Sequence, residues 1–131
     1  MVILGMTDFG HMEAGGVKKR LVSGQPGDPN SVAVMLDFKN DSCKTIEAIV
    51  FFFLPYDAVN HIVSSGQRKP EEARLRFIGA IQPNEIKRQV YWENVWYSQE
   101  IVQVKLMHID ITYTDGSMES LNDRQIQYEC A

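Results

Sequence analysis

The sequence predicts an all-β protein, an immunoglobulin-like antiparallel β-sandwich of about seven short strands. Apolar residues alternate with polar ones over most of the chain, a spacing that indicates strands with one buried face. Clusters of Gly, Pro, Asn, Asp and Ser separate these runs, as expected for turns. A length of 131 residues suits a single domain with its own core.

The first two predicted strands cover residues 31–40 and 46–54. In the first, Val32, Val34, Leu36 and Phe38 point to one side. The second, "IEAIVFFFL", is apolar on both faces, which is typical of a central strand. Proline cannot donate to a strand ladder, so Pro55 is expected to end it.

The next two predicted strands are residues 73–81 and a segment that starts at residue 86. In the first, Leu75 and Phe77 share one face, and Arg74 and Arg76 share the other. The second runs into the aromatic stretch "YWENVWY" at 91–97. Residues 86–97 also fit a broken helical stripe, but Tyr, Trp and Val favour a strand.

The segment 101–113 reads as one long strand with a fault. Apolar residues occupy one parity up to Leu106 and the other parity from Met107 onward. Such a switch predicts a β-bulge or a change of partner strand. The Asp115-Gly116 pair then predicts a tight hairpin turn, from which residues 118–121 should pair back.

These elements divide the chain into three parts. Residues 1–30 are rich in Gly, Pro, Asp and Ser and are expected to form an N-terminal arm or edge hairpin, with a small strand at 17–22. Residues 31–122 form the sandwich. Residues 123–131 form a C-terminal tail.

Three stretches together resemble a family of small bacterial Ig-like β-sandwich domains of unknown function. They are the Pro-Tyr-x-Ala-Val turn at 55–59, the Trp-Glu-Asn-Val-Trp-Tyr segment at 92–97, and the Tyr-x-Asp-Gly hairpin at 113–116. The chain departs from the family pattern at Asp57, where Asn is expected, and at Asn60, where Gly is expected. The resemblance implies a fold, but no catalytic activity, ligand or functional residue.

The composition excludes several classes of protein. A net charge of −4 argues against a general nucleic-acid binder. The longest apolar run, near residues 48–55, is far too short to span a membrane, and the apolar start lacks the features of a secretory signal. Cys43 and Cys130 are expected to be free thiols, and a single disulfide between them is the alternative. The protein is expected to be cytoplasmic, although a secreted chain whose signal was removed would look the same.

Catalytic and metal-binding motifs are missing from the sequence. No Gly-x-Ser-x-Gly, Cys-x-x-Cys or His-Glu-x-x-His pattern occurs. We therefore predict no catalytic residue, metal or cofactor. A metal-dependent hydrolase that uses His11 or His108 is the weakest alternative, because His108 and Asp110 fit the solvated face of a strand.

Positive charge is concentrated in one segment. Residues 66–90 carry six basic and three acidic residues, a net charge of +3 that leaves −7 on the rest of the chain. If residues 86–90 pair beside 73–77, Lys87 or Arg88 would join Arg74 and Arg76 on one surface. Grouped guanidinium groups suit phosphate or carboxylate ligands, whereas a plain solvated strand face needs no ligand.

Both tryptophans, Trp92 and Trp96, lie in the aromatic stretch. Aromatic rings on a surface can stack on sugars or bases, but a sandwich of this size also needs large residues in its core. We predict that at least one of the two is mostly buried. The preferred function is a non-catalytic binding module that contacts another protein or self-associates. The alternative is binding of a small anionic ligand, a nucleotide or an acidic sugar, by Arg74, Arg76, Arg88, Trp92 and Trp96.

Overall fold

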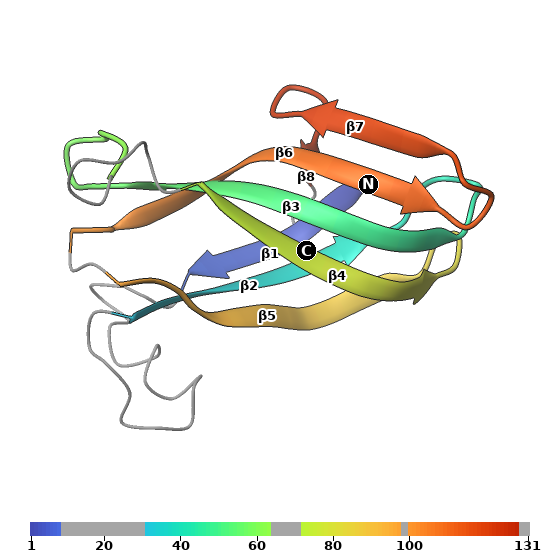
Figure 1. Cartoon of the computed structure of the whole chain (residues 1–131), viewed down its shortest axis with the longest axis horizontal. Helices are drawn as coiled ribbons and strands as arrows, with labels where there is room; N and C mark the ends of the chain where they lie inside the picture. Colours follow the sequence, from blue (N-terminus) through green and yellow to red (C-terminus); the bar gives the residue numbers. More distant parts are fainter. Residues whose placement is uncertain (9–30, 64–71, 98–99, 129–131) are drawn as a thin grey trace.

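The computed structural model describes residues 1–8, 31–63, 72–97 and 100–128. These residues form eight β-strands and no helix, and none of them belongs to a helix that could cross a membrane. The strands build two four-stranded sheets that face each other (Figure 1). The prediction of an all-β, two-layer fold is confirmed.

The first sheet has the strand order β5-β2-β1-β8. Its members are β1 (Val2–Asp8), β2 (Ser31–Lys39), β5 (Ile86–Tyr97) and β8 (Gln127–Tyr128). Pairing is antiparallel except between β1 and β8, which run parallel. Because residues 86–97 form β5, the helical alternative for this segment is wrong.

The second sheet has the order β4-β3-β6-β7 and is antiparallel throughout. Its members are β3 (Ile46–Tyr56), β4 (Ala73–Ile81), β6 (Gln103–Tyr113) and β7 (Met118–Asn122). β3 lies between β4 and β6, as its apolar residues on both faces predict. The strand continues through Pro55, which lies opposite Val104 in β6, so the expected break at this proline does not occur.

The core lies between the two sheets and follows the predicted alternation. Its most deeply buried members include aromatic and branched residues from both layers: Val32, Val34, Leu36, Phe38, Ile49, Phe51, Phe53 and Ile109. The rings of Phe38 and Phe51 meet across the layers with centroids 5.2 Å apart. Burial of these side chains is the main stabilising contribution to such a fold.

The predicted fault in β6 is a bulge. His108 pairs with Phe52 and Leu106 pairs with Phe53, so Met107 is the extra residue between two successive pairs. One added residue reverses the side-chain alternation. Before the bulge, the even-numbered Val104 and Leu106 face the core. After the bulge, the core-facing residues are odd-numbered: Ile109, Ile111 and Tyr113.

Both ends of the chain differ from the expected arm and tail. Val2–Asp8 is an inner strand that pairs with β2 and β8, and Ile3 is almost fully buried. At the other end, β8 joins the same sheet and Ile126 is buried. Two segments far apart in sequence thus complete one sheet. The strand proposed at residues 17–22 lies outside the described residues.

Candidate functional site

Arg74 and Arg76 lie on the outer face of the second sheet, the face that points away from the first sheet. Along β4 every second residue is exposed, and these two belong to the exposed set. The strand register places Arg74 beside Phe52 and Arg76 beside Val50 of β3. The alternation in the sequence therefore placed both arginines on one face, as predicted.

Arg88 does not join them, and this part of the predicted arrangement is wrong. β5 pairs with β2 in the first sheet and not with β4. The connection at residues 82–85 thus passes from one sheet to the other instead of closing a hairpin. The guanidinium of Arg88 lies 3.8 Å from the carboxylate of Asp37 on β2.

The two tryptophans close the sandwich on its β4–β5 side. Trp96 is only 5% exposed and belongs to the core, so the prediction that at least one tryptophan is buried is confirmed. Trp92 is partly buried, and its ring contacts Phe51 edge-on with centroids 5.7 Å apart. The indole Nε1 donates a hydrogen bond to the carbonyl oxygen of Arg76 at 3.1 Å. These contacts serve packing between the sheets, and the buried Trp96 ring offers no surface to a ligand.

The outer face instead combines the arginines with an aromatic residue that was not a predicted site residue. Phe52 lies between Arg74 on β4 and His108 on β6 in one cross-strand row. The guanidinium carbon of Arg74 is 5.5 Å from the centroid of the Phe52 ring. The imidazole of His108 meets the same ring edge-on, with centroids 5.0 Å apart. Cation–π contact of this kind attracts the guanidinium to the aromatic ring.

Asp110, one row farther along β6, binds two neighbours through a single oxygen atom. His108 Nε2 lies 2.6 Å and Ser120 Oγ 2.7 Å from Asp110 Oδ1. Burial by itself raises the pKa of Asp110, but the hydrogen bonds from Ser120 and His108 and the positive charges nearby outweigh it. The pKa of this carboxyl is therefore below its ordinary value. An ionised carboxylate has no proton to donate, so Asp110 accepts from both partners.

Serine, histidine and aspartate meet here, but not as a nucleophilic triad. In a triad the histidine bonds the serine and the carboxylate orients the histidine. Here Ser120 donates to Asp110 and not to His108, so the imidazole is not placed to take the proton of its hydroxyl. The described residues also contain no group of three or more metal-ligating side chains. His11 lies outside the described residues.

The next row gives the outer face its apolar part. Ile78 on β4 and Met118 on β7 are 70% and 72% exposed, and between them lie the smaller residues Ala48 and Thr112. Together with Phe52 and Val50, they form a face that is apolar along its middle. Arginines border it on one side and the His108–Asp110 pair on the other. The sequence showed which residues share a strand face, but only the register shows which ones are neighbours.

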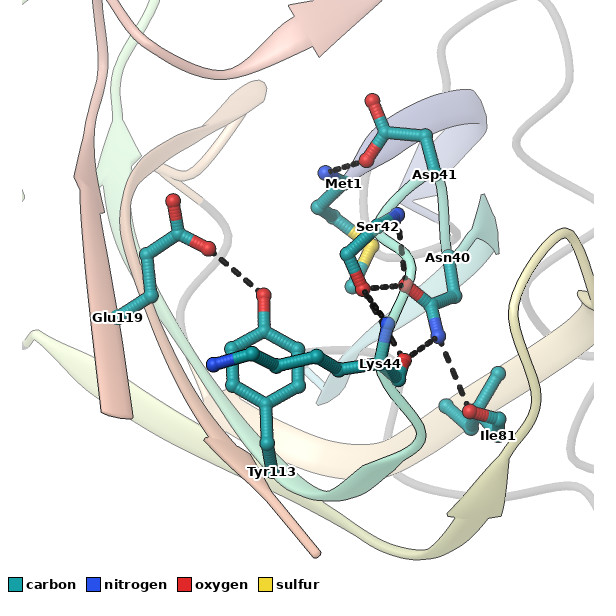
Figure 2. A network of polar contacts seen from close by, with 8 residues as sticks. All are labelled: Met1, Asn40, Asp41, Ser42, Lys44, Ile81, Tyr113 and Glu119. Carbon is teal, nitrogen blue, oxygen red and sulfur yellow. Dashed lines mark hydrogen bonds and ion pairs between the residues drawn. The ribbon is translucent and has the colours of Figure 1, made fainter. Parts of the chain in front are cut away.

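A second polar cluster lies at the end of the sandwich where β2 passes into β3 (Figure 2). Asn40 is a buried polar residue, and all its side-chain groups are satisfied. Its Nδ2 donates to the carbonyls of Lys44 and Ile81, and its Oδ1 accepts from the backbone N–H and the hydroxyl of Ser42. Because every donor and acceptor is used within the fold, this cluster holds the connection in place rather than binding a ligand.

Cys43 in the same connection is exposed and has a free thiol, while Cys130 lies outside the described residues.

The outer face of the second sheet is the surface where predicted site residues and exposed apolar side chains come together. Comparison of the chain with protein-family models, with curated proteins and with solved structures found no match. The resemblance to a family of small Ig-like domains stays a prediction.

Proposed function

We propose that this chain is a non-catalytic, immunoglobulin-like binding module that contacts a protein partner through the outer face of its second sheet. The observation that carries the proposal is the make-up of this face. Phe52 and Val50 on the inner strand β3, with the exposed Ile78 and Met118 on the outer strands β4 and β7, form an apolar band beside two arginines. An apolar centre with a charged border is the usual composition of a protein interface.

The order of the strands supports the immunoglobulin-like part of the proposal. In such domains the strands named A, B and E are neighbours in one sheet, and C, F and G are neighbours in the other. Here β1, β2 and β5 are neighbours in one sheet, and β3, β6 and β7 are neighbours in the other. β4 extends the second sheet beside β3, in the position of the additional C′ strand of variable-type domains.

The charges of the outer face favour an acidic partner. The side chain of Arg74 is 73% exposed, and its Nε lies 3.7 Å from the carboxylate of Glu72. Arg76 is exposed on the same face. The one acid in the middle of the face, Asp110, already accepts hydrogen bonds from His108 and Ser120. An exposed arginine can bind a carboxylate through two parallel hydrogen bonds.

A small anionic ligand, a nucleotide or an acidic sugar, is the second candidate. The motivating observation is the position of Arg74 above the Phe52 ring, which pairs a cation with a flat apolar surface. A ring that stacks on Phe52 could place its anionic group at Arg74 or Arg76. Trp92, Trp96 and Arg88 have no part in this version of the site.

The test reverses charge on this face. An Arg74→Glu/Arg76→Glu variant is compared with a Lys87→Glu/Arg88→Glu variant, which makes the same charge change on the other sheet. Each immobilised protein is exposed to an extract, and the retained proteins are quantified at low and high salt. We expect at least one protein from the extract to bind both wild type and the Lys87→Glu/Arg88→Glu control. Its binding should weaken at high salt and be lost in the Arg74→Glu/Arg76→Glu variant. Equal retention by both variants would contradict the proposal.

A titration separates the two candidates. ATP and glucuronate are added to the labelled protein while its amide NMR signals are followed. Shifts confined to residues around Phe52, abolished in Arg74→Ala, would favour the small-ligand function. Unchanged spectra together with a retained protein would favour the protein-binding function.

A further inference from the structure

β6 has an open backbone edge along its first half. On one side it pairs with β3 over its whole length. On the other side β7 pairs only from His108 to Thr112. Among the described residues, the segment 103–107 therefore has no strand neighbour on that side. Unpaired backbone N–H and C=O groups at a sheet edge are a template for another strand.

The described part of the connection after β7 does not pair with this edge. At Asn122 the chain turns, with its side-chain oxygen accepting the N–H groups of Arg124 and Gln125. It then crosses to the first sheet, where β8 pairs with β1. β7 thus stops at the residue opposite His108, directly beyond the bulge at Met107.

A cleft of about 440 Å³ runs along the open edge. Its walls include residues 103–107, Tyr56, Asp123 and Tyr128. Five consecutive residues of one strand line it, and consecutive residues point to opposite faces. The cleft therefore runs along residues 103–107 of β6. Five extended residues measure about 17 Å, enough to receive a short strand.

The pairing with β3 shows which groups face the cleft. Pro55 lies opposite Val104 in β6. Because proline has no N–H to donate, this pair is a non-hydrogen-bonded pair of the antiparallel ladder. In such a pair the N–H and C=O of Val104 point away from β3, and those of Leu106 follow two residues later. Two donors and two acceptors of β6 are thus directed at the cleft.

Lys105, the charged residue in the middle of this edge, does not shield it. Its Nζ lies 4.3 Å from the centroid of the Tyr56 ring and donates to Asn60 Oδ1 at 3.2 Å, on the β3 side. Edge lysines commonly discourage strand addition, but this one is drawn back toward β3. It still disfavours self-pairing, because a second copy paired antiparallel about Lys105 would place two lysines opposite each other.

From the open edge, the cleft and the position of Lys105 we infer that residues 103–107 accept an extended peptide from a partner as an added strand of the second sheet. The backbone of the peptide would bond Val104 and Leu106. Side chains of an extended peptide alternate between the two faces of the sheet. The peptide residues beside Val104 and Leu106 would therefore be apolar and enter the cleft, and the residue between them would be acidic and face Lys105. This site is separate from the outer face and independent of its proposed function.

The probe is a library of random linear peptides about seven residues long, from which binders of the wild-type protein are selected. Hydrogen exchange of the wild type then shows where the best peptide binds. We expect slower exchange at the amides of Val104 and Leu106, and peptides that alternate apolar and acidic residues. Failure to enrich any peptide, or protection elsewhere, would overturn the inference.

Two variants of one residue test the backbone contact. Val104→Pro removes an edge N–H, whereas Val104→Ala keeps the N–H and controls for altered packing at this position. We expect the peptide to bind Val104→Pro about tenfold or more weakly and Val104→Ala with little change. Equal affinities would contradict strand addition. The same amides could also become protected without peptide, to an extent that rises with protein concentration. That result would identify a second copy of the chain as the occupant and would contradict the peptide proposal.

The Arg74→Glu/Arg76→Glu variant keeps the two proposals apart. It should bind the selected peptide like wild type while losing any partner of the outer face. If both kinds of binding fail together in this variant, the sites are not independent.

Discussion

The indole of Trp92 on β5 donates a hydrogen bond to the backbone carbonyl of Arg76 on β4, at 3.1 Å and across the gap between the two sheets. β4 and β5 are the edge strands of different sheets, so no ladder joins them. The bond therefore closes this side of the sandwich. It also accounts for the close approach of the aromatic-rich segment of β5 to the arginine-rich strand β4.

We expect Trp92→Phe to lower the free energy of unfolding by about 1–2 kcal/mol, because it removes this bond and part of the contact with Phe51. Urea denaturation of both proteins measures the change. The matched control is Tyr91→Phe, one residue away and exposed, with an expected change of about 0.5 kcal/mol or less. Equal effects of the two substitutions would show that Trp92 does not join the sheets.

Asn40→Ala should be among the more damaging single substitutions in the described residues. It leaves the carbonyls of Lys44 and Ile81 without this donor and the N–H of Ser42 without this acceptor, in a buried position. We expect a loss of about 3 kcal/mol in the free energy of unfolding. Ser42→Ala, which removes one member of the same network, should cost about 1 kcal/mol. A small effect of Asn40→Ala would mean that water replaces the amide.

Local pattern predicted the strands between residues 31 and 122, but it did not predict β1, β8 or the long-range pairing. Alternation identified the buried face of β2 and β4, and even the bulge at Met107, because side-chain parity is a property of neighbouring residues. The inner position of β1 depends instead on pairing with β2 and with β8 at the far end of the chain. β1 has seven residues and contains a glycine, so its sequence carries little evidence of an inner position in a sheet.

The candidate site shows the same division. Alternation placed Arg74 and Arg76 on one face correctly. It could not decide whether the short connection at 82–85 closes a hairpin or crosses between sheets, because both need the same turn residues. Arg88 was misplaced for this reason. Phe52 became a site residue only through its register with Arg74 and His108.

The hairpin turn between β6 and β7 depends on Gly116. Its φ of +88° lies in the left-handed region, where a residue with a Cβ is strained. No other group lies near the position of an added Cβ, so the cost of Gly116→Ala comes from the backbone alone. We expect a loss of about 1 kcal/mol in the free energy of unfolding by urea denaturation. Gly116→Asn should cost less, since Asn tolerates this conformation better. If Ala costs no more than Asn, backbone strain does not set the stability of the turn.

Tyr113 should couple stability to alkaline pH. Burial, followed by the hydrogen bond that its hydroxyl donates to Glu119 at 2.7 Å, raises the pKa of Tyr113 to about 12. In the unfolded chain a tyrosine ionises near pH 10. Its contribution to stability is thus fully present below pH 10 and is lost as the pH rises toward 12, because the unfolded state releases the proton first.

The measurement is the free energy of unfolding at several pH values from 8 to 12, for wild type and for Tyr113→Phe. At pH 8 the variant should be less stable by about 1 kcal/mol, the usual value of one hydrogen bond. Between pH 10 and 12 its stability should fall less steeply, so the two curves converge. Tyr91→Phe, which removes an exposed hydroxyl, controls for the loss of one ionisable tyrosine and should keep the slope of wild type. Parallel curves for Tyr113→Phe and wild type would show that the buried hydroxyl ionises as readily in the folded protein as in the unfolded chain.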